Sequence, residues 1–177
     1  MLAKSKDKNY HQGLVTIGLI NPKSATNVGV ILRACGCYGA SSIFYTGERF
    51  RHAKAFHTDT KNTHQQVPTI GVDDIMAMQP KGAESVVIEL VEGALPLPQF
   101  VHPTNAYYIF GPEDNSVPQD VIDQADHVVY IPTRSSMNLA ATANVVLYDR
   151  MAKSDYPHGD EFIRQVRDTN NNAKVTK

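Results

Sequence analysis

The chain has 177 residues, of which 42% are hydrophobic and 20% charged, and its formal net charge is −1. This composition is that of an ordinary globular domain with a sizeable core, and it argues against both a disordered chain and a strongly basic nucleic-acid-binding protein. No apolar run approaches the roughly 18 residues of a membrane span. The polar residues 1–12 lack the apolar segment of a signal peptide. We therefore expect a cytoplasmic protein with no membrane association.

The two cysteines agree with that expectation. Cys35 and Cys37 lie two positions apart in a predicted helix, where their side chains point in different directions. A disulfide between them is therefore not expected. Two cysteines are also too few for a structural zinc site, so we interpret both as reduced thiols and expect no metal.

Charge is unevenly distributed along the chain. Residues 1–65 contain nine lysines and arginines against three acidic residues, whereas residues 66–148 contain two against ten. Such asymmetry is typical of a protein with a basic face that meets phosphates. Charge alone is equally compatible with a second interpretation, in which these charged residues lie in solvated loops and the sign of their charge has no functional meaning.

The first part of the chain predicts one β-α-β unit. The apolar runs 14–20 and 41–46 predict buried strands. The helix between them starts near Val28, ends near Gly39, and is expected to be capped by Thr26 or Asn27. Such a unit implies parallel strands joined by a right-handed crossover. The basic segment 47–66 follows and is predicted to be a long connection to the next strand.

The rest of the chain continues the alternation. Strands are predicted at 67–70, 85–90, 106–111 and 127–132, short helices at 72–78 and 118–125, and a long, well-buried apolar helix at 137–153. The alternation predicts an α/β fold, a mostly parallel sheet with helices on both faces. We expect a basic tail at 1–12, one domain at 13–153, and a polar, partly disordered tail at 154–177 with a helical stretch at 159–167.

Polar turns follow three of the predicted strands, at 21–27, 111–118 and 132–138. Ligands of parallel α/β sheets bind at the carboxyl ends of strands, so these turns predict the site. The sequence contains no GxGxxG, GxxxxGK[ST], GxSxG, HExxH or paired CxxC. It thereby argues against a common dinucleotide site, a P-loop, an α/β-hydrolase and a zinc enzyme. His52, His57 and His64 lack the spacing of metal ligands.

Three separated segments carry a specific resemblance. The first segment has Asn27, Gly29 and Arg33 in the pattern N-x-G-x-x-x-R. The second has Gly111, Glu113 and Val117 in the pattern G-x-E-x-x-G-[LV], with Ser116 where glycine is usual. The third has Ser136, Met137 and Asn138, which lie between Ile131-Pro132 and an apolar helix. Together and in this order they resemble the SpoU/TrmH-like RNA ribose 2′-O-methyltransferases of the SPOUT superfamily. The resemblance spans roughly residues 14–150 and makes 13–153 a SPOUT-like methyltransferase domain.

The resemblance implies a fold, a cofactor and partners. The C-terminal part of the sheet would be tied in a trefoil knot that forms the S-adenosylmethionine site. The protein would be a homodimer with that site beside the subunit interface. It would transfer a methyl group to a ribose 2′-OH of tRNA or rRNA. Without a separate RNA-binding domain, the catalytic domain, its dimer and its tails would recognise the RNA.

The resemblance also assigns site residues. The implied catalytic residues are Arg33, Asn27, Glu113, Ser136 and Asn138. The implied cofactor-binding residues are Phe110, Gly111, Pro112, Glu113, Ile131, Pro132, Ser136 and Met137. RNA would meet Arg33, Arg49, Arg51, Lys54 and Arg134. Because arginine is a poor base with a pKa above about 12, stabilising phosphate or alkoxide charge is the easier role for Arg33.

Each of these residues can also be interpreted as having no part in catalysis or binding. Asn27, Ser136 and Asn138 are all favoured helix caps, and Arg33 could be a surface arginine. Two other functions therefore stay open: an RNA- or cofactor-binding protein without catalysis, and a small-molecule transferase with an enclosed pocket. The joint presence of all five catalytic residue types favours the RNA methyltransferase.

Overall fold

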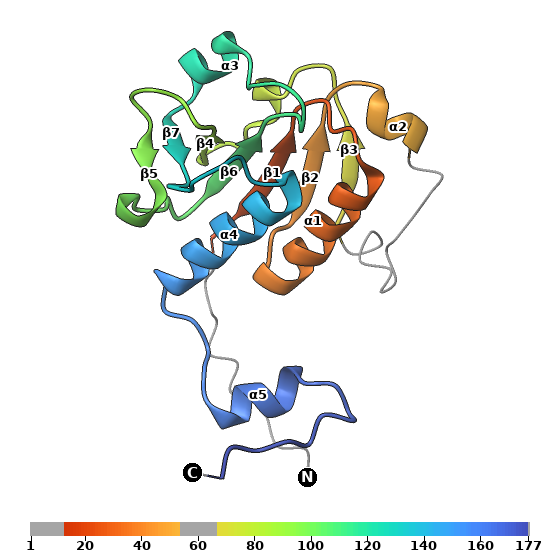
Figure 1. Ribbon diagram of the computed structural model, residues 1–177, viewed down its shortest axis with the longest axis vertical. Helices are drawn as coiled ribbons and strands as arrows, with labels where there is room; N and C mark the ends of the chain where they lie inside the picture. The colour runs from red at the N-terminus through yellow and green to blue at the C-terminus, as the bar shows by residue number, and fades with distance from the viewer. Residues whose placement is uncertain (1–12, 54–66, 177) are drawn as a thin grey trace.

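The computed structural model describes residues 13–53 and 67–176. Its strands form a seven-stranded sheet in the order β3-β2-β1-β6-β4-β7-β5, and all the paired strands in these residues are parallel. Helices α1 and α4 lie side by side against one face of the sheet (Figure 1). Helix α3 contributes to a second core on the other face. The α/β class predicted from the sequence is confirmed.

The element bounds agree closely with the expected pattern. The strands are β1 (Val15–Leu19), β2 (Ser42–Tyr45), β3 (Thr69–Gly71), β4 (Glu84–Ile88), β5 (Leu95–Pro96), β6 (Ala106–Phe110) and β7 (His127–Tyr130). The helices are α1 (Ala25–Tyr38), α2 (Arg49–Ala53), α3 (Gln119–Gln124), α4 (Leu139–Ala152) and α5 (Asp160–Val166), with 3₁₀ turns η2 (Met76–Met78) and η3 (Leu97–Gln99). The helix predicted at 72–78 is only the turn η2. The two-residue strand β5 has no sequence pattern and was missed.

Strand β6 shows why these strands are apolar throughout. Tyr108 and Phe110 point into the core beneath α1 and α4. Tyr107 and Ile109 point into the core on the opposite face. Successive side chains of a strand alternate between faces, and both faces are covered here, so both sets are apolar.

Helix α1 begins earlier than the sequence suggested. Its N-cap is Ser24, whose hydroxyl accepts a 3.2 Å hydrogen bond from the backbone N–H of Asn27. The predicted caps, Thr26 and Asn27, were wrong because Ser24, a good cap itself, already has the extended backbone (φ −96°, ψ 115°) that a cap requires. Gly39 ends the helix with φ 75°, as predicted. Asn27 therefore lies inside the first turn, with its side chain free for other contacts.

Helix α4 is not buried on all sides, contrary to expectation. Val146 and Leu147 face the core, but Val145 is 36% exposed and Tyr148 55% exposed. On the neighbouring helix α1, Val30 is 43% exposed. We call these three residues the outer face of α1 and α4. The apolar pattern of a helix predicts that a side is covered, but it does not distinguish a side that packs within the chain from a side that packs on another molecule.

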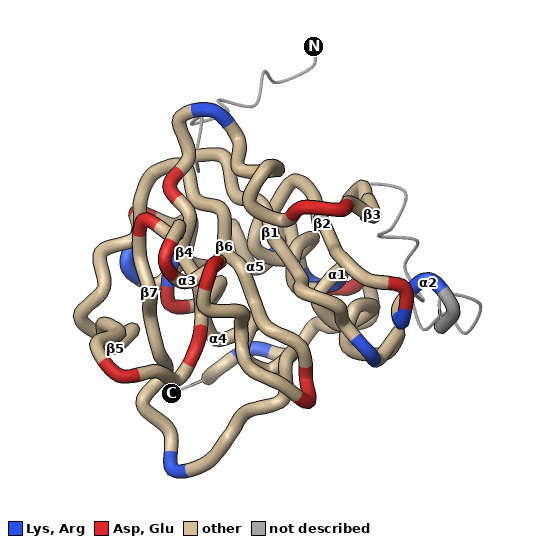
Figure 2. Tube along the Cα trace, turned by 90° about the horizontal axis from the view of Figure 1, so that it is seen from above, with Lys and Arg blue, Asp and Glu red and all other residues tan. Residues whose placement is uncertain are grey.

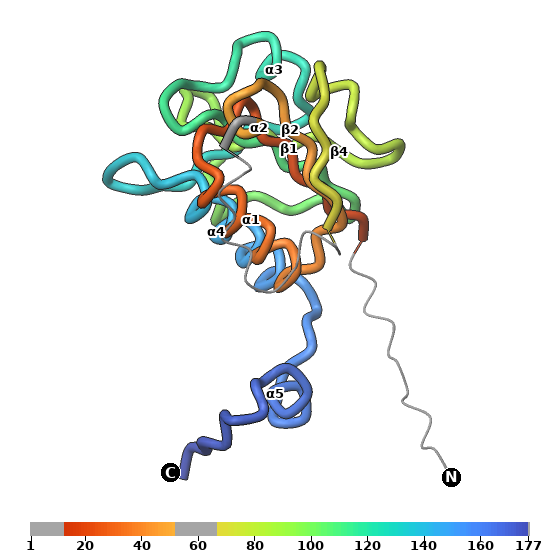
Figure 3. Tube along the Cα trace, turned by 90° about the vertical axis from the view of Figure 1, so that its right-hand side faces the viewer, coloured from red at the N-terminus to blue at the C-terminus, as the bar shows by residue number. Residues whose placement is uncertain are grey.

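The C-terminal residues extend from the domain. The helix α5 confirms the helical stretch predicted at 159–167, and it lies away from the sheet (Figure 3). Both cysteines are free; Cys37 is exposed, whereas burial raises the pKa of the Cys35 thiol to about 12. None of the helices within 13–53 and 67–176 has the length and apolarity needed to cross a bilayer.

Candidate functional site

The site lies where the chain order of the sheet reverses. Strand β1 is followed on one side by β2 and β3, while β6, β4 and β7 continue on the other side. In open parallel sheets the crevice for a ligand forms at this switch, outside the carboxyl ends of the strands. Here the turn after β1 meets the turn after β6.

Glu113 joins these two turns. Its carboxylate follows β6 and accepts hydrogen bonds from the backbone N–H groups of Lys23 (2.8 Å) and Ser24 (3.0 Å), at the start of α1. It also accepts a 3.0 Å hydrogen bond from the side-chain amide of Asn27. The carboxylate thus satisfies the backbone donors of the N-cap residue and of the residue before it.

The third motif joins the same network. The side-chain amide of Asn138 donates a 3.1 Å hydrogen bond to the side-chain oxygen of Asn27. The Asn138 oxygen accepts from the backbone N–H groups of Ala140 (2.9 Å) and Ala141 (3.3 Å), so Asn138 is the N-cap of α4. One residue from each motif thereby forms a continuous chain, Glu113–Asn27–Asn138.

The electrostatics of Glu113 define what it can do. Partial burial raises the pKa of its carboxyl, but the hydrogen bonds from Asn27 and from the backbone of Lys23 and Ser24 outweigh this, so the pKa lies below its usual value of 4.5. Because hydrogen bonds to the charged form favour it, Glu113 is ionised at neutral pH. A carboxylate held in this way is a poor proton acceptor at pH 7 and acts by positioning its partners.

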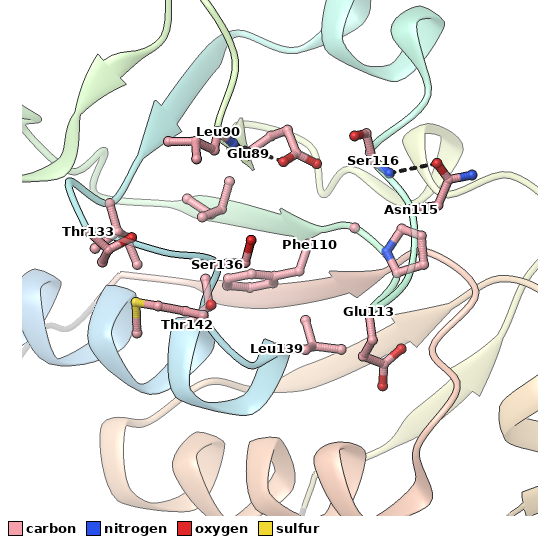
Figure 4. Close-up of a pocket in the computed structure, with 15 residues that line it drawn as sticks. Glu89, Leu90, Phe110, Glu113, Asn115, Ser116, Thr133, Ser136, Leu139 and Thr142 are labelled. Atoms are coloured by element: carbon pink, nitrogen blue, oxygen red, sulfur yellow. Dashed lines mark hydrogen bonds between the residues drawn. The ribbon is translucent and has the colours of Figure 1, made fainter.

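A cavity of about 350 Å³ opens beside this network, between the ends of β4, β6 and β7 and the start of α4 (Figure 4). It is lined by Ile88, Glu89, Leu90, Phe110, Gly111, Pro112, Glu113, Asn115, Ser116, Ile131, Thr133, Ser136, Met137, Leu139 and Thr142. Seven of the eight residues expected to bind cofactor are among them. Pro132 is exposed and lies outside the lining.

The chemistry of this lining suits a nucleoside. Phe110, Ile131 and Leu139 offer apolar surface for a flat ring, while carboxylates, hydroxyls and an amide offer partners for a polar sugar and its substituents. The volume falls within the roughly 300–1,000 Å³ of small-molecule sites. The cavity therefore fits S-adenosylmethionine, whose adenine, ribose and amino-acid parts need this mixture.

Gly111 allows two parts of the cavity wall to approach closely. A Cβ at this position would lie 3.0 Å from a side-chain carbon of Val117 and 3.3 Å from Glu89 Oε2. Glu89 was missed by the sequence analysis because none of the three motifs includes it. The available signal was an acidic residue directly after the apolar run of β4, at the carboxyl end where ligands bind.

Ser116, which stands where the family pattern has glycine, causes no backbone strain. Among the described non-glycine residues only Asn21 has a positive φ, at 44°. Ser116 therefore has an ordinary backbone conformation that does not require glycine. Its N–H donates a 2.9 Å hydrogen bond to Asn115 Oδ1.

Arg33 lies apart from the network within one chain. It is exposed on α1, six residues after Asn27, which places it about 9 Å further along the helix and about 240° round its axis. Its side chain makes no hydrogen bond or ion pair within the described residues. Ser136, expected to contact Arg33 or substrate, is exposed at the cavity and likewise has no hydrogen bond within the residues described.

Arg49 is fixed at the rim of the site. Its guanidinium donates to both carboxylate oxygens of Asp114 (2.9 and 2.8 Å) and to the backbone and side-chain oxygens of Asn21. Glycine at position 47 allows the chain to pass close to Asn21, because a Cβ there would lie 2.3 Å from Asn21 Oδ1. The hydrogen bonds from Arg49 lower the pKa of the Asp114 carboxyl.

Two of the remaining residues expected to meet RNA are exposed. Arg51 pairs with Glu48 at 3.1 Å and is exposed, as is Arg134 in the loop after β7. In Figure 2 basic residues stand around α2 and the start of α1, while acidic residues gather near α3 and β4. Lys54 and the histidines at 57 and 64 lie outside the described residues.

Within the described ranges no three His, Cys, Asp or Glu side chains lie close enough to hold a metal ion.

Comparisons with known proteins place these features in context. A sequence profile of the SpoU rRNA Methylase family matches residues 14–148, which include all three motifs. A tRNA (cytidine(34)-2′-O)-methyltransferase of Yersinia pestis is 26% identical over 160 residues, covering 81% of this chain and 96% of the relative. A TrmH/SpoU tRNA modifying enzyme of A. aeolicus has a TM-score of 0.71 at 20% identity, covering 80% of this chain and 76% of that one. The SpoU methyltransferase AviRb of Streptomyces viridochromogenes, in complex with AdoMet, has a TM-score of 0.65 at 18% identity, covering 78% and 57%.

Proposed function

Because the chain belongs to the SpoU rRNA Methylase family, we propose that it transfers the methyl group of S-adenosylmethionine to a ribose 2′-OH of RNA. The family membership confirms the resemblance read from the three motifs. The observation that carries the proposal is the hydrogen-bonded chain Glu113–Asn27–Asn138 at the edge of a nucleoside-sized cavity. The trefoil knot expected of this family is part of the proposal.

The cavity would hold S-adenosylmethionine, which is supported by its complex with the structural neighbour AviRb. The apolar side chains Phe110, Ile131 and Met137 would pack on the adenine, and the loop from Gly111 to Ser116 would flank the polar parts. When bound, this cofactor supplies a methyl group on a sulfonium that is open to direct displacement by an oxygen nucleophile.

The side chains would act mainly by positioning and by stabilising charge. A ribose hydroxyl is a weak nucleophile until it loses its proton. Glu113, with its lowered pKa, would hold Asn27 and Asn138 in place rather than accept that proton. Arg33 would stabilise negative charge that develops on the ribose oxygen and on the neighbouring phosphate. In the transfer, the bond from the ribose oxygen to the methyl carbon would form as the sulfur–methyl bond breaks, leaving S-adenosylhomocysteine, and the hydroxyl proton would leave to solvent water. Fixed geometry of this kind lowers the barrier.

We include a homodimer in the proposal. The outer face of α1 and α4 is apolar and uncovered in the single chain, with Val30, Val145 and Tyr148 exposed. Arg33 lies next to Val30 on α1, since residues three apart share a helix face. A dimer formed through this face would bring Arg33 of one subunit toward the other subunit, which is consistent with its distance from its own Glu113 network.

The RNA would be a tRNA, with rRNA as the other candidate, in the cytoplasm. The Yersinia pestis relative acts on tRNA by its name, and this chain covers 96% of it. RNA phosphates would meet Arg33, Arg51, Lys54 and Arg134, with Arg49 at the rim of the site. Binding should then weaken as salt is raised, because each phosphate contact releases counterions.

The decisive experiment is methyl transfer from labelled S-adenosylmethionine into bulk tRNA and, separately, rRNA, followed by nucleoside analysis. A labelled 2′-O-methylnucleoside is expected from tRNA, and the Arg33→Ala protein serves as the inactive control. Label in a base would overturn the ribose assignment. Cofactor binding without any incorporation into either RNA would favour the non-catalytic binding protein.

A further inference from the structure

We propose that Glu89 binds the ribose hydroxyls of the cofactor, an inference that rests on the proposed function. Glu89 directly follows β4, which lies between β6 and β7 in the sheet. The loops after these three strands form the cavity, so a side chain at the end of β4 lies on its central wall. Figure 4 shows the Glu89 carboxylate among the lining residues, on the side of the loop that carries Ser116.

The carboxylate is fixed but still has acceptor capacity. Its Oε2 accepts a 2.9 Å hydrogen bond from the backbone N–H of Val117, and its Oε1 accepts one of 2.9 Å from the N–H of Leu90. Each oxygen of an ionised carboxylate can accept about two hydrogen bonds, so each keeps one further acceptor position. The half-buried side chain is therefore preorganised to receive two donors from the cavity.

The pair of ribose hydroxyls matches this arrangement. The ring of a nucleoside would occupy the apolar part of the cavity, beside Phe110 and Ile131, while the reacting end must face the Glu113–Asn27 network. The sugar connects these two ends and so passes the middle of the wall, where Glu89 lies. Two adjacent hydroxyl donors suit a carboxylate with two free acceptor positions, and an acidic residue at a strand end plays this part in dinucleotide sites.

The close approach at Gly111 ties this role to the loop after β6. Any side chain at position 111 would press on Glu89 Oε2 and on Val117 at once. Glu89 therefore has two separable tasks: it holds the loop through the Val117 N–H, and it presents its remaining acceptors to the sugar. An experiment has to distinguish the second task from the first.

The test is calorimetric binding of three ligands: S-adenosylhomocysteine, 5′-methylthioadenosine, which lacks the amino-acid part, and 5′-methylthio-2′,3′-dideoxyadenosine, which also lacks both hydroxyls. The variants are Glu89→Ala and Glu89→Gln, which keeps a carbonyl acceptor for the Val117 N–H. Glu92→Gln, in the exposed loop three residues on, is the charge-matched control.

We expect both Glu89 variants to bind the first two ligands about tenfold more weakly than the wild type, the size of a lost hydrogen bond to a charged group. The wild type should bind the dideoxy ligand about tenfold more weakly than 5′-methylthioadenosine, whereas the Glu89 variants should bind both alike. Glu92→Gln should behave as the wild type.

Three results would overturn the inference while leaving the proposed function intact. Equal losses for the ribose and dideoxy ligands would show that Glu89 only holds the loop. A loss for S-adenosylhomocysteine but not for 5′-methylthioadenosine would place Glu89 at the amino-acid part. Unchanged binding by both variants would remove Glu89 from the site. If the wild type binds neither natural ligand, the proposed function fails and the inference fails with it.

Discussion

The side-chain amide of Asn27 donates a 3.0 Å hydrogen bond to the carboxylate of Glu113, although 86 residues separate them in the chain. Each is also engaged elsewhere: Glu113 by the backbone at the start of α1, and Asn27 by Asn138. Removing one member of such a network leaves the others with unsatisfied polar groups, which costs more than the hydrogen bond itself contributed.

Replacing Glu113 with glutamine should therefore destabilise the protein in a pH-dependent way. The lowered pKa of Glu113 means that its contribution is fully present above the usual value of 4.5 and is lost as pH falls through the folded-state pKa. At pH 7, Glu113→Gln should cost about 1–2 kcal/mol, allowing for partial solvent exposure. The gap to the wild type should narrow as pH falls from 4.5 through the lowered folded-state pKa. Urea unfolding at pH 7 and pH 3 measures both values.

The control for this prediction is Glu161→Gln, an exposed glutamate on α5. Its difference from the wild type should stay near zero at both pH values. A gap for Glu113→Gln that is the same at pH 7 and pH 3 would contradict the argument, because it would arise from packing rather than from the charge of the carboxylate.

Two substitutions of Asn138 should separate its structural and functional roles. Asn138→Ala removes the N-cap of α4, which costs about 1 kcal/mol, and also the link to Asn27. Asn138→Asp keeps a capping oxygen but cannot donate to Asn27. We expect the aspartate variant to be more stable than the alanine variant, because it keeps the cap of α4, yet to lose most methyl transfer. Full single-turnover activity in that variant would show that the Asn27–Asn138 link is not used.

Replacing Arg33 with alanine should abolish transfer without affecting the fold. The side chain is exposed and makes no hydrogen bond or ion pair with the described residues, so stability should change by less than about 0.5 kcal/mol. If Arg33 stabilises charge on the ribose oxygen, the transfer rate should fall about 100-fold or more. Binding of S-adenosylhomocysteine should be unchanged; its loss would instead place Arg33 in the cofactor site. Arg164→Ala, on the exposed side of α5, is the control.

An acidic residue on the outer face of α1 and α4 should prevent dimer formation. Val145→Asp would bury a charge in the proposed interface and weaken association by at least about a hundredfold. Sedimentation velocity should then report a monomer, and transfer should fall with it. Val166→Asp, on α5 and more exposed than Val145, should leave the dimer intact. A dimer that survives Val145→Asp would exclude this face as the interface.

Much of the fold could be predicted because its strands are covered on both sides. The apolar run that became β1 and the run that became β6 need no knowledge of partners to be recognised. The polar turns after apolar strands predicted where the site lies, whereas the roles of Asn27, Glu113 and Asn138 came from the resemblance to the methyltransferase family.

The features that were missed depend on contacts distant in sequence or on other molecules. Ser24 took the cap of α1 partly because Glu113 binds its N–H, and no local pattern contains that contact. Glu89 became part of the cavity only when β4 was placed between β6 and β7. Val145 and Tyr148 were expected to be buried because apolar residues on a helix indicate a covered surface without indicating what covers it.

The hydrogen bond between Asn27 and Asn138 spans 111 residues, so the order in which the chain is synthesised matters. When α1 leaves the ribosome, neither Glu113 nor Asn138 has been made, and the first turn of α1 lacks the partners that fix Asn27. Pairing of β1 with β6 must likewise wait for residue 110. The proposed site therefore cannot form until residue 138 has been synthesised, because a shorter nascent chain lacks the Glu113–Asn27–Asn138 network. Contacts of such long range also favour slow folding, which leaves apolar strands exposed on the nascent chain and makes them natural targets for chaperones.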